Sequence, residues 1–244
     1  MQTTLCIDPG IRNLSLIIMN SDYTIKLWDT FNILEDDNYL CKGVFKNGKI
    51  CNRKCSMKYK LDENISFSCK THFPKKITKT KVNHFKRKNI DEYLLQDIAI
   101  TFLNKLDKLI ESNEIFKSLT SIFIELQPKC NPKSLFVSHL LYFKFIELYK
   151  NDIPIKFVRA SQKLKAYTGP KIECKLKGKY AQRKFLSIEY GRWFLENKFS
   201  EEQRNKWLPT LTGKIDDRND CLLMAINAIT GVPKTKNKKG NCIK

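Results

Sequence analysis

Four acidic side chains could act together on a phosphodiester. Asp8 ends the short apolar segment "TLCID", just before a Pro-Gly turn, and Glu125 lies in the apolar segment "FIELQP". Asp217 and Asp220 are three residues apart in "KIDDRNDCLLMA", so they share one face of a predicted helix start. A carboxylate beside apolar strand residues is costly unless a counter-charge compensates it, and Mg²⁺ prefers carboxylate oxygens. The four acids therefore predict a divalent-metal site.

Each acid taken alone has a simpler interpretation. Asp8 could cap a turn, and Glu125 could pair with a buried arginine. Asp216 could cap the last helix, and it also competes with Asp217 for the face that carries Asp220. The combination favours chemistry, because two ions ~4 Å apart can activate a water and stabilise a leaving oxygen. We expect two Mg²⁺ ions, or Mn²⁺, bound by Asp8, Glu125, Asp217 and Asp220.

The elements that would position these acids follow from the apolar periodicity. Residues 4–7, 14–19 and 24–32 are β-prone and separated by turns, which predicts an antiparallel meander. After an irregular segment, helical and buried-strand patterns alternate, and a last helix runs from Asp216 to Thr230. A meander followed by alternating helices and strands predicts an α/β fold with a mixed sheet flanked by helices.

The domain boundaries follow from shifts in composition. Residues 1–35 and 89–233 are predicted to form the α/β domain. Residues 36–88 are rich in Lys, Cys and Asn, with little apolar periodicity, and are predicted to be an inserted module. Residues 234–244 are predicted to be a basic tail that adds affinity for polyanions.

The inserted module carries a metal-ligand pattern of its own. Zinc prefers four Cys or His ligands in a tetrahedral array. The predicted structural zinc ligands are Cys41, Cys51, Cys69 and His72, with Cys55 as an alternate. "CKTH" places two donors across a tight turn, and a polar segment of this length has little else to fold around. The alternative is a loop with free thiols.

The charge of the chain predicts a polyanionic partner. The 244 residues carry 45 Lys and Arg against 25 Asp and Glu, a formal net charge of +20. Nucleic acid is the first candidate, an anionic membrane surface is the second, and a lysine-rich surface without a partner is the alternative. No segment approaches the ~20 apolar residues of a membrane span. Nine cysteines without a secretory signal indicate an intracellular, reducing compartment.

The predicted DNA contacts lie near the acids and in the basic stretch 159–184. Arg12 and Lys129 flank two of the acids, and Tyr167 and Tyr180 could stack on unpaired bases. The stretch 159–184 also includes Arg159, Lys163 and Lys165. The residues assigned to DNA binding are Arg12, Lys129, Lys171, Lys175, Lys177, Lys179, Arg183 and Lys184.

Three motifs in order resemble one nuclease family. "CIDPGIRNLSLIIM", "FIELQP" and "DDRNDCLLMA" are similar to the RNase H-like fold of RuvC-type Holliday-junction resolvases, especially the poxvirus and mitochondrial branch, and "YAQRKFLSIEYGRWFL" resembles that branch's basic helix. The resemblance covers about residues 1–34 and 90–231. RuvC has a histidine shortly after its last aspartate, whereas this chain reads "CLLMA", and Lys214 is the candidate substitute for that base. The inserted module also departs from the family.

The resemblance implies metal-dependent cleavage of four-way DNA junctions by a symmetric homodimer, with Asp8, Glu125, Asp217 and Asp220 as the catalytic acids. If the chain is viral, as poxvirus-like motifs would imply, it would act in virus factories in the host cytoplasm. Two alternatives stay open. One is another RNase H-like nuclease, transposon-derived or RNA-cleaving, and the other is a non-catalytic zinc-dependent nucleic-acid binder.

Overall fold

The computed structural model describes residues 1–34, 40–61, 64–75, 77, 82–84, 89–211 and 216–231. The chain divides into two compact units, Met1–Asn32 with Phe102–Lys244 and Ile33–Thr101. The segment 36–88 lies inside the second unit, which also takes in the start of helix α1 (Leu95–Glu111). The predicted tail 234–244 and Lys214 lie outside the described residues.

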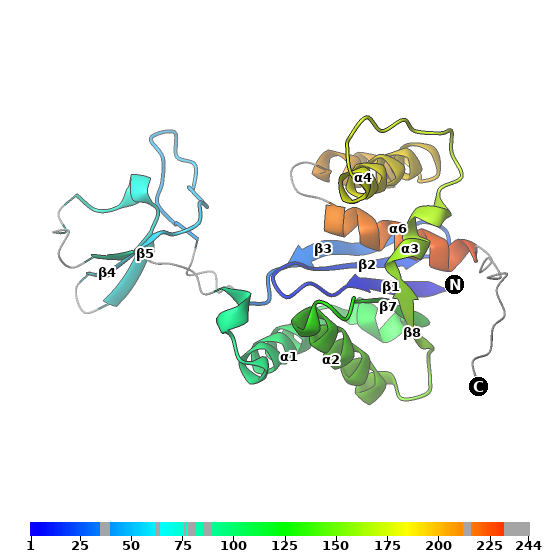
Figure 1. Ribbon diagram of the computed structural model, residues 1–244, viewed down its shortest axis with the longest axis horizontal. Coiled ribbons are helices and arrows are strands. Elements are labelled where there is room, and N and C mark those ends of the chain that lie inside the picture. Colours follow the sequence, from blue (N-terminus) through cyan, green and yellow to red (C-terminus); the bar gives the residue numbers. More distant parts are fainter. Residues whose placement is uncertain are drawn as a thin grey trace. The chain divides into compact units, whose positions relative to one another are not determined.

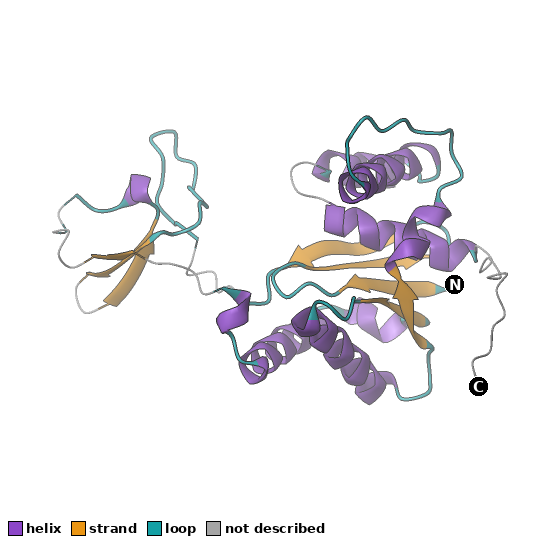
Figure 2. Ribbon diagram, in the orientation of Figure 1, coloured by secondary structure: helices purple, strands orange, loops and turns teal. Residues whose placement is uncertain are grey.

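A five-stranded mixed sheet is the centre of the first unit, in the strand order β3-β2-β1-β7-β8 (Figures 1 and 2). The strands β1 (Thr3–Asp8), β2 (Leu14–Asn20) and β3 (Ile25–Phe31) form the antiparallel meander that the sequence predicts. Strands β7 (Ser121–Leu126) and β8 (Ile155–Arg159) add in parallel beside β1. Three antiparallel strands followed by parallel ones, with helices on both faces, are the predicted RNase H-like arrangement, and the fold class is confirmed.

Helices cover both faces of this sheet. On one face lie α2 (Pro132–Tyr149) and the part of α1 from Phe102 onward, joined by an ion pair of 3.0 Å between Lys144 Nζ and Asp107 Oδ1 (Figure 1). On the other face α6 (Asp216–Thr230) packs across β1 and β2, and α4 (Lys179–Asn197) packs on α6. Two shorter α-helices in the described part of the chain are α3 (Ala160–Lys163) and α5 (Glu201–Trp207).

The core follows from strand alternation. Successive side chains of a strand point to opposite faces, so the buried residues Cys6, Ile17 and Met19 pack toward α6, where Leu222 and Ile226 complete the same apolar cluster. Burial on both faces explains why β1 and β2 read as continuous apolar runs.

Helix α4 approaches α6 closely at a glycine. A Cβ atom at Gly191 would lie 2.0 Å from Oδ1 of the fully buried Asn219, so a larger residue there would have to displace the Asn219 side chain. This contact sets α4 against the turn of α6 that carries Asp220.

The second unit contains a three-stranded sheet that the sequence patterns did not predict. It has the order β5-β4-β6, with β4 (Met57–Leu61) paired antiparallel to both β5 (Asn64–Ser68) and β6 (Val82–His84). Its strands are short, and β4 and β5 bury one side chain each, which explains why residues 36–88 show little apolar periodicity. Its buried cluster consists of the cysteines 41, 55 and 69.

Candidate active site and candidate metal centre

Three of the four predicted acids meet at one point. Carboxylate oxygens of Asp8, Glu125 and Asp220 all lie within 4.8 Å of one another. Two oxygens bound to one Mg²⁺ at ~2.1 Å lie up to ~4.2 Å apart, so small movements would let all three bind the same ion. Three acids that are each at least 95 positions apart in the chain therefore form one negatively charged site.

The sheet register explains why Asp8 and Glu125 are neighbours. Strands β1 and β7 are parallel, and Ile7 pairs with Ile124, so the next residue on each strand is an acid. A tight turn follows Asp8, in which Gly10 N–H donates to the Asp8 carbonyl oxygen at 3.0 Å. A Cβ atom at Gly10 would lie 2.3 Å from the carbonyl oxygen of Asn13, so this turn requires glycine.

Asp220 reaches the site from the opposite layer. It lies on the second turn of α6, which packs across β1, and its side chain is 19% exposed. The buried Ser187 of α4 donates its hydroxyl to Asp220 Oδ1 at 2.5 Å. Gln127 donates from Nε2 to Asp8 Oδ1 at 3.2 Å. These partners hold one oxygen of Asp8 and one of Asp220 in a fixed orientation.

Lys163 provides a positive charge inside the acid cluster. Its Nζ lies 3.2 Å from Glu125 Oε2 and also pairs with Asp220 Oδ2. Lys163 and Glu125 side chains are 13% and 8% exposed, so this is a largely buried ion pair. From the sequence, Lys163 is assigned only to the basic stretch 159–184. Its contacts with Glu125 and Asp220 could not be predicted from the spacing of residues along the chain.

The electrostatics of the acid site favour the binding of a cation. Burial raises the pKa of Asp8 well above its usual range, repulsion from Glu125 raises it further, and Lys163 opposes both. Burial also raises the pKa of Glu125, against the attraction of Lys163. Although burial opposes it, the acids around Lys163 raise the pKa of its ammonium above the usual range. Among the described residues, Lys163 is the cation that pairs with these acids, and one lysine compensates three carboxylates only in part.

Asp217 lies close to the cluster but is not one of the three acids whose oxygens meet. Its charge contributes to the raised pKa of both Asp8 and Glu125. Asp217 therefore stays a predicted ligand. The side chain of Asp216, its competitor, lies outside the described residues.

Most of the predicted DNA-binding residues are exposed. Lys171, Lys175, Lys177, Lys179 and Arg183 are exposed on the loop and first turns that lead into α4. Lys129 is exposed in the turn after β7, and Arg12 is half-buried after the Asp8 turn. Lys184 lies over the ring of Tyr180, which is 72% exposed. Tyr167 differs from expectation, because its ring stacks on Tyr190 with centroids 3.7 Å apart.

The second unit brings together the four predicted zinc donors. Donor atoms of Cys41, Cys51, Cys69 and His72 lie within 4.8 Å of one another. The Sγ atoms of Cys51 and Cys69 are 3.8 Å apart, and His72 Nδ1 lies 3.5 Å from Cys69 Sγ. Ligands at ~2.3 Å in a tetrahedron around zinc are ~3.8 Å apart, so this cluster fits zinc.

The chemistry of Cys69 also suits a metal ligand. Burial raises its pKa, but hydrogen bonds from the backbone and side chain of His72 outweigh burial and lower the pKa to about 6. Cys55, the predicted alternate, is buried in the same apolar cluster but is not one of the four donors that meet.

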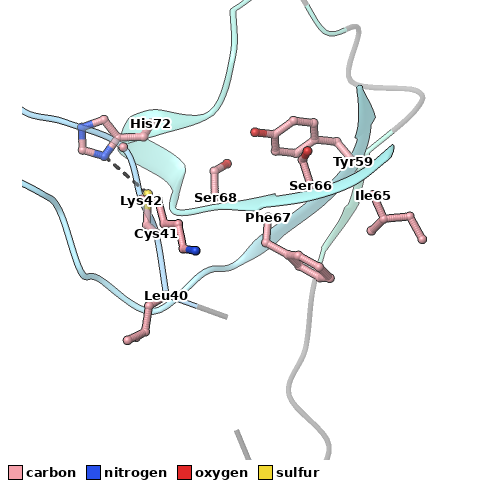
Figure 3. Close-up of a pocket in the computed structure, with 10 residues that line it drawn as sticks. Leu40, Cys41, Lys42, Tyr59, Ile65, Ser66, Phe67, Ser68 and His72 are labelled. Carbon is pink, nitrogen blue, oxygen red and sulfur yellow. Dashed lines mark hydrogen bonds between the residues drawn. The ribbon is translucent and has the colours of Figure 1, made fainter. Parts of the chain in front are cut away.

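A pocket of about 390 Å³ adjoins the cluster and is lined by Tyr59, Phe67 and Ser66 among others (Figure 3).

Comparisons with known proteins give two matches of note. No protein-family model matches the chain. It is 26% identical over 209 residues to the Uncharacterized protein L451 of Acanthamoeba polyphaga mimivirus, an alignment that covers 78% of this chain and 49% of that protein. The chain thus spans about half the length of the curated relative that it matches. Among solved structures, it is similar to the yeast mitochondrial Holliday junction resolvase Ydc2, with a TM-score of 0.46, 14% identity, and coverage of 93% of this chain and 79% of that one.

The part of the chain that the structure describes has no helix long and apolar enough to cross a lipid bilayer.

Proposed function

We propose that this chain is a divalent-metal-dependent endonuclease that cleaves branched DNA, with four-way junctions as the preferred substrate. The observation that carries the proposal is the convergence of Asp8, Glu125 and Asp220 from two strands and a helix on one point. A structural acid needs one partner, whereas three acids with a single shared lysine leave negative charge that a metal ion would balance.

The residues of the site take separate roles in this proposal. Asp8, Glu125 and Asp220, with Asp217 beside them, would hold Mg²⁺ or Mn²⁺, in the two-ion arrangement that the motifs predict. The bound ions would supply an activated water and stabilisation of the leaving 3′ oxygen. Ser187 and Gln127 fix the orientation of Asp220 and Asp8 through their hydrogen bonds. Lys163 keeps the metal-free acids together through its pairs with Glu125 and Asp220.

The basic surface supports a nucleic-acid substrate. The exposed cations Lys171, Lys175 and Lys177 precede α4, and Lys179 is its first residue; the same helix contributes Ser187 to the acid site. Contacts of lysine with phosphates carry no base code, so they favour recognition by shape. We further propose that the chain acts as a symmetric homodimer on two strands of a junction, and that zinc bound by Cys41, Cys51, Cys69 and His72 stabilises the second unit.

The test is cleavage of labelled DNA. A synthetic four-way junction, a flap, a plain duplex and an RNA–DNA hybrid are each incubated with the protein and Mg²⁺, and a junction cut fastest supports the proposal. Asp8→Asn and Glu125→Gln should each lower the rate by more than ~100-fold, since loss of even a residue that only orients a metal ligand costs up to that much. Glu196→Gln, which changes an exposed acid on α4, should leave the rate unchanged.

Two results would count against the proposal. A wild-type rate of junction cleavage in Asp8→Asn would show that the acid cluster takes no part in the reaction. Preferential cleavage of the RNA–DNA hybrid would move the chain to a different class of RNase H-like nuclease.

A further inference from the structure

A β-ribbon extends from the zinc-donor cluster of the second unit. Residues 40–54 fold back on themselves, with β-bridges between Leu40 and Lys54 and between Val44 and Ile50. The turn at the tip is closed by a hydrogen bond of 2.9 Å from Gly48 N–H to the Phe45 carbonyl oxygen. Gly48 has a φ of 78°, which only glycine adopts without strain. The ribbon is therefore a defined two-stranded element and not an open loop.

The cluster of donors fixes both arms of this ribbon. Cys41 lies on the first arm and Cys51 on the second, and both are among the four converging donors. Cys51 N–H donates to the Gly43 carbonyl oxygen at 2.8 Å, which ties the arms together between the two cysteines. Gly43 packs so closely against the His72 ring that a Cβ atom at Gly43 would lie 2.4 Å from the nearest ring atom. A metal ion at this point would hold the base of the ribbon rigid.

The ribbon carries an uncompensated positive charge. Between residues 40 and 54 there are five Lys and Arg and no acid, and residues 36–88 hold fifteen Lys and Arg against four acids. The ribbon cations are Lys42, Lys46, Lys49, Arg53 and Lys54. All five are exposed, and within the described part of the chain no acid pairs with any of them. Like charges so close together repel, and a polyanion would relieve that repulsion.

The shape of the ribbon and its exposed apolar side chains favour duplex DNA among the possible polyanions. A two-stranded β-ribbon has the width that the major groove of duplex DNA admits. Val44 and Ile50, which pair across the ribbon, are 57% and 60% exposed. Sugar rings or thymine methyl groups would cover such side chains, while the lysines around them reach phosphates on either side of the groove.

We propose that the ribbon Leu40–Lys54 is a second DNA-binding element, which holds a duplex arm through its phosphates and shares no residue with the acid site. This inference rests on the proposed function only in taking DNA as the partner. The ribbon contributes to affinity, and this contribution is largely independent of base sequence. It therefore strengthens the binding of any duplex arm, whether or not the acid site then cleaves that arm.

The test compares two triple variants of the full-length, zinc-loaded protein. Lys46→Gln/Lys49→Gln/Lys54→Gln removes three ribbon charges, and Lys26→Gln/Lys108→Gln/Lys156→Gln removes three exposed charges from the first unit. Binding to a fluorescein-labelled 20-bp duplex and to a four-way junction is measured by anisotropy from 50 to 300 mM salt, without Mg²⁺. The ribbon variant should bind both DNAs at least tenfold more weakly, and its slope of log K against log salt should fall by ~0.9 for each phosphate that it no longer neutralises.

The outcomes separate this inference from the proposed function. Equal affinity and slope for the two variants would overturn the inference, as would tighter binding of single-stranded RNA than of duplex DNA. One zinc per chain in the ribbon variant shows that weaker binding is not a loss of folding. If the wild-type protein cuts no DNA but the ribbon variant still binds duplex more weakly, the nuclease proposal fails and the ribbon inference stands.

Discussion

Lys163 Nζ lies 3.2 Å from Glu125 Oε2, in a part of the molecule that solvent scarcely reaches. The same ammonium also pairs with Asp220, so one cation links β7 to α6 across the acid site. The lysine therefore has a structural role in the metal-free protein. The ammonium group of Lys163 also lies where a divalent ion would bind, so lysine and metal compete for the carboxylate oxygens of Glu125 and Asp220.

Lys163→Ala should have opposite effects on the stability of the metal-free protein and on its affinity for metal. Loss of one partner of a buried ion pair costs ~3 kcal/mol, so the free energy of unfolding without metal should fall by about that amount. The affinity for Mn²⁺, measured by calorimetry, should rise, because the competing charge is gone. Lys165→Ala, two residues away and exposed, is the matched control. An unchanged or weaker Mn²⁺ affinity in Lys163→Ala would contradict the competition.

Ser187→Ala should weaken metal binding without a large loss of stability. The Ser187 hydroxyl holds Asp220 Oδ1 at 2.5 Å, and partners of this kind are worth ~10-fold in metal affinity. The measurement is Mn²⁺ binding by calorimetry, together with thermal unfolding. Ser138→Ala is the matched control, since Ser138 is also a buried helix serine but bonds only the Leu135 carbonyl oxygen in the structure. Identical metal affinities for both variants would remove Ser187 from the site.

Substitutions in the second unit should separate the zinc ligands from the spare cysteine. Cys51→Ser should lower the zinc content measured by plasma emission spectrometry to well below one per chain, whereas Cys55→Ser should keep one zinc, because Cys55 is not among the converging donors. Protons should also compete with the metal as the pH falls through about 6, the lowered pKa of Cys69, so a chelator should remove zinc faster below that pH. Zinc loss in Cys55→Ser would show that the alternate ligand is used.

The acid cluster should make the stability of the metal-free protein depend on pH. Folding raises the pKa of Asp8 and Glu125, chiefly by burial, so the folded state favours their protonated forms. Stability from this source is present in mild acid and is lost as the pH rises through the raised pKa values. Denaturant unfolding from pH 4 to 8 should show this decline, Mg²⁺ should reverse it at neutral pH, and Asp8→Asn should flatten it. A decline of equal size in Asp8→Asn would point to other groups.

Sequence patterns were sufficient for the fold class, because the signals involved are local. In the meander, β1 and β2 show apolar runs that end at turns, and α6 runs from Asp216 to Thr230, as the apolar periodicity predicts. The insertion was different. Its short, half-exposed strands β4 and β5 bury few apolar side chains, so no periodicity marks them.

The sequence by itself determined which residues are acids and which are candidate metal donors, and it made phosphates the expected partner, since residue type and spacing carry that chemistry. Only the tertiary structure decided which of them meet. Parallel pairing of β1 with β7 places Asp8 beside Glu125, and packing of α6 across the sheet adds Asp220 but leaves Asp217 outside the group of three. The same packing moves Lys163 from a basic stretch into the acid site. Contacts between residues so far apart in the chain depend on register and layer packing, which no local pattern encodes.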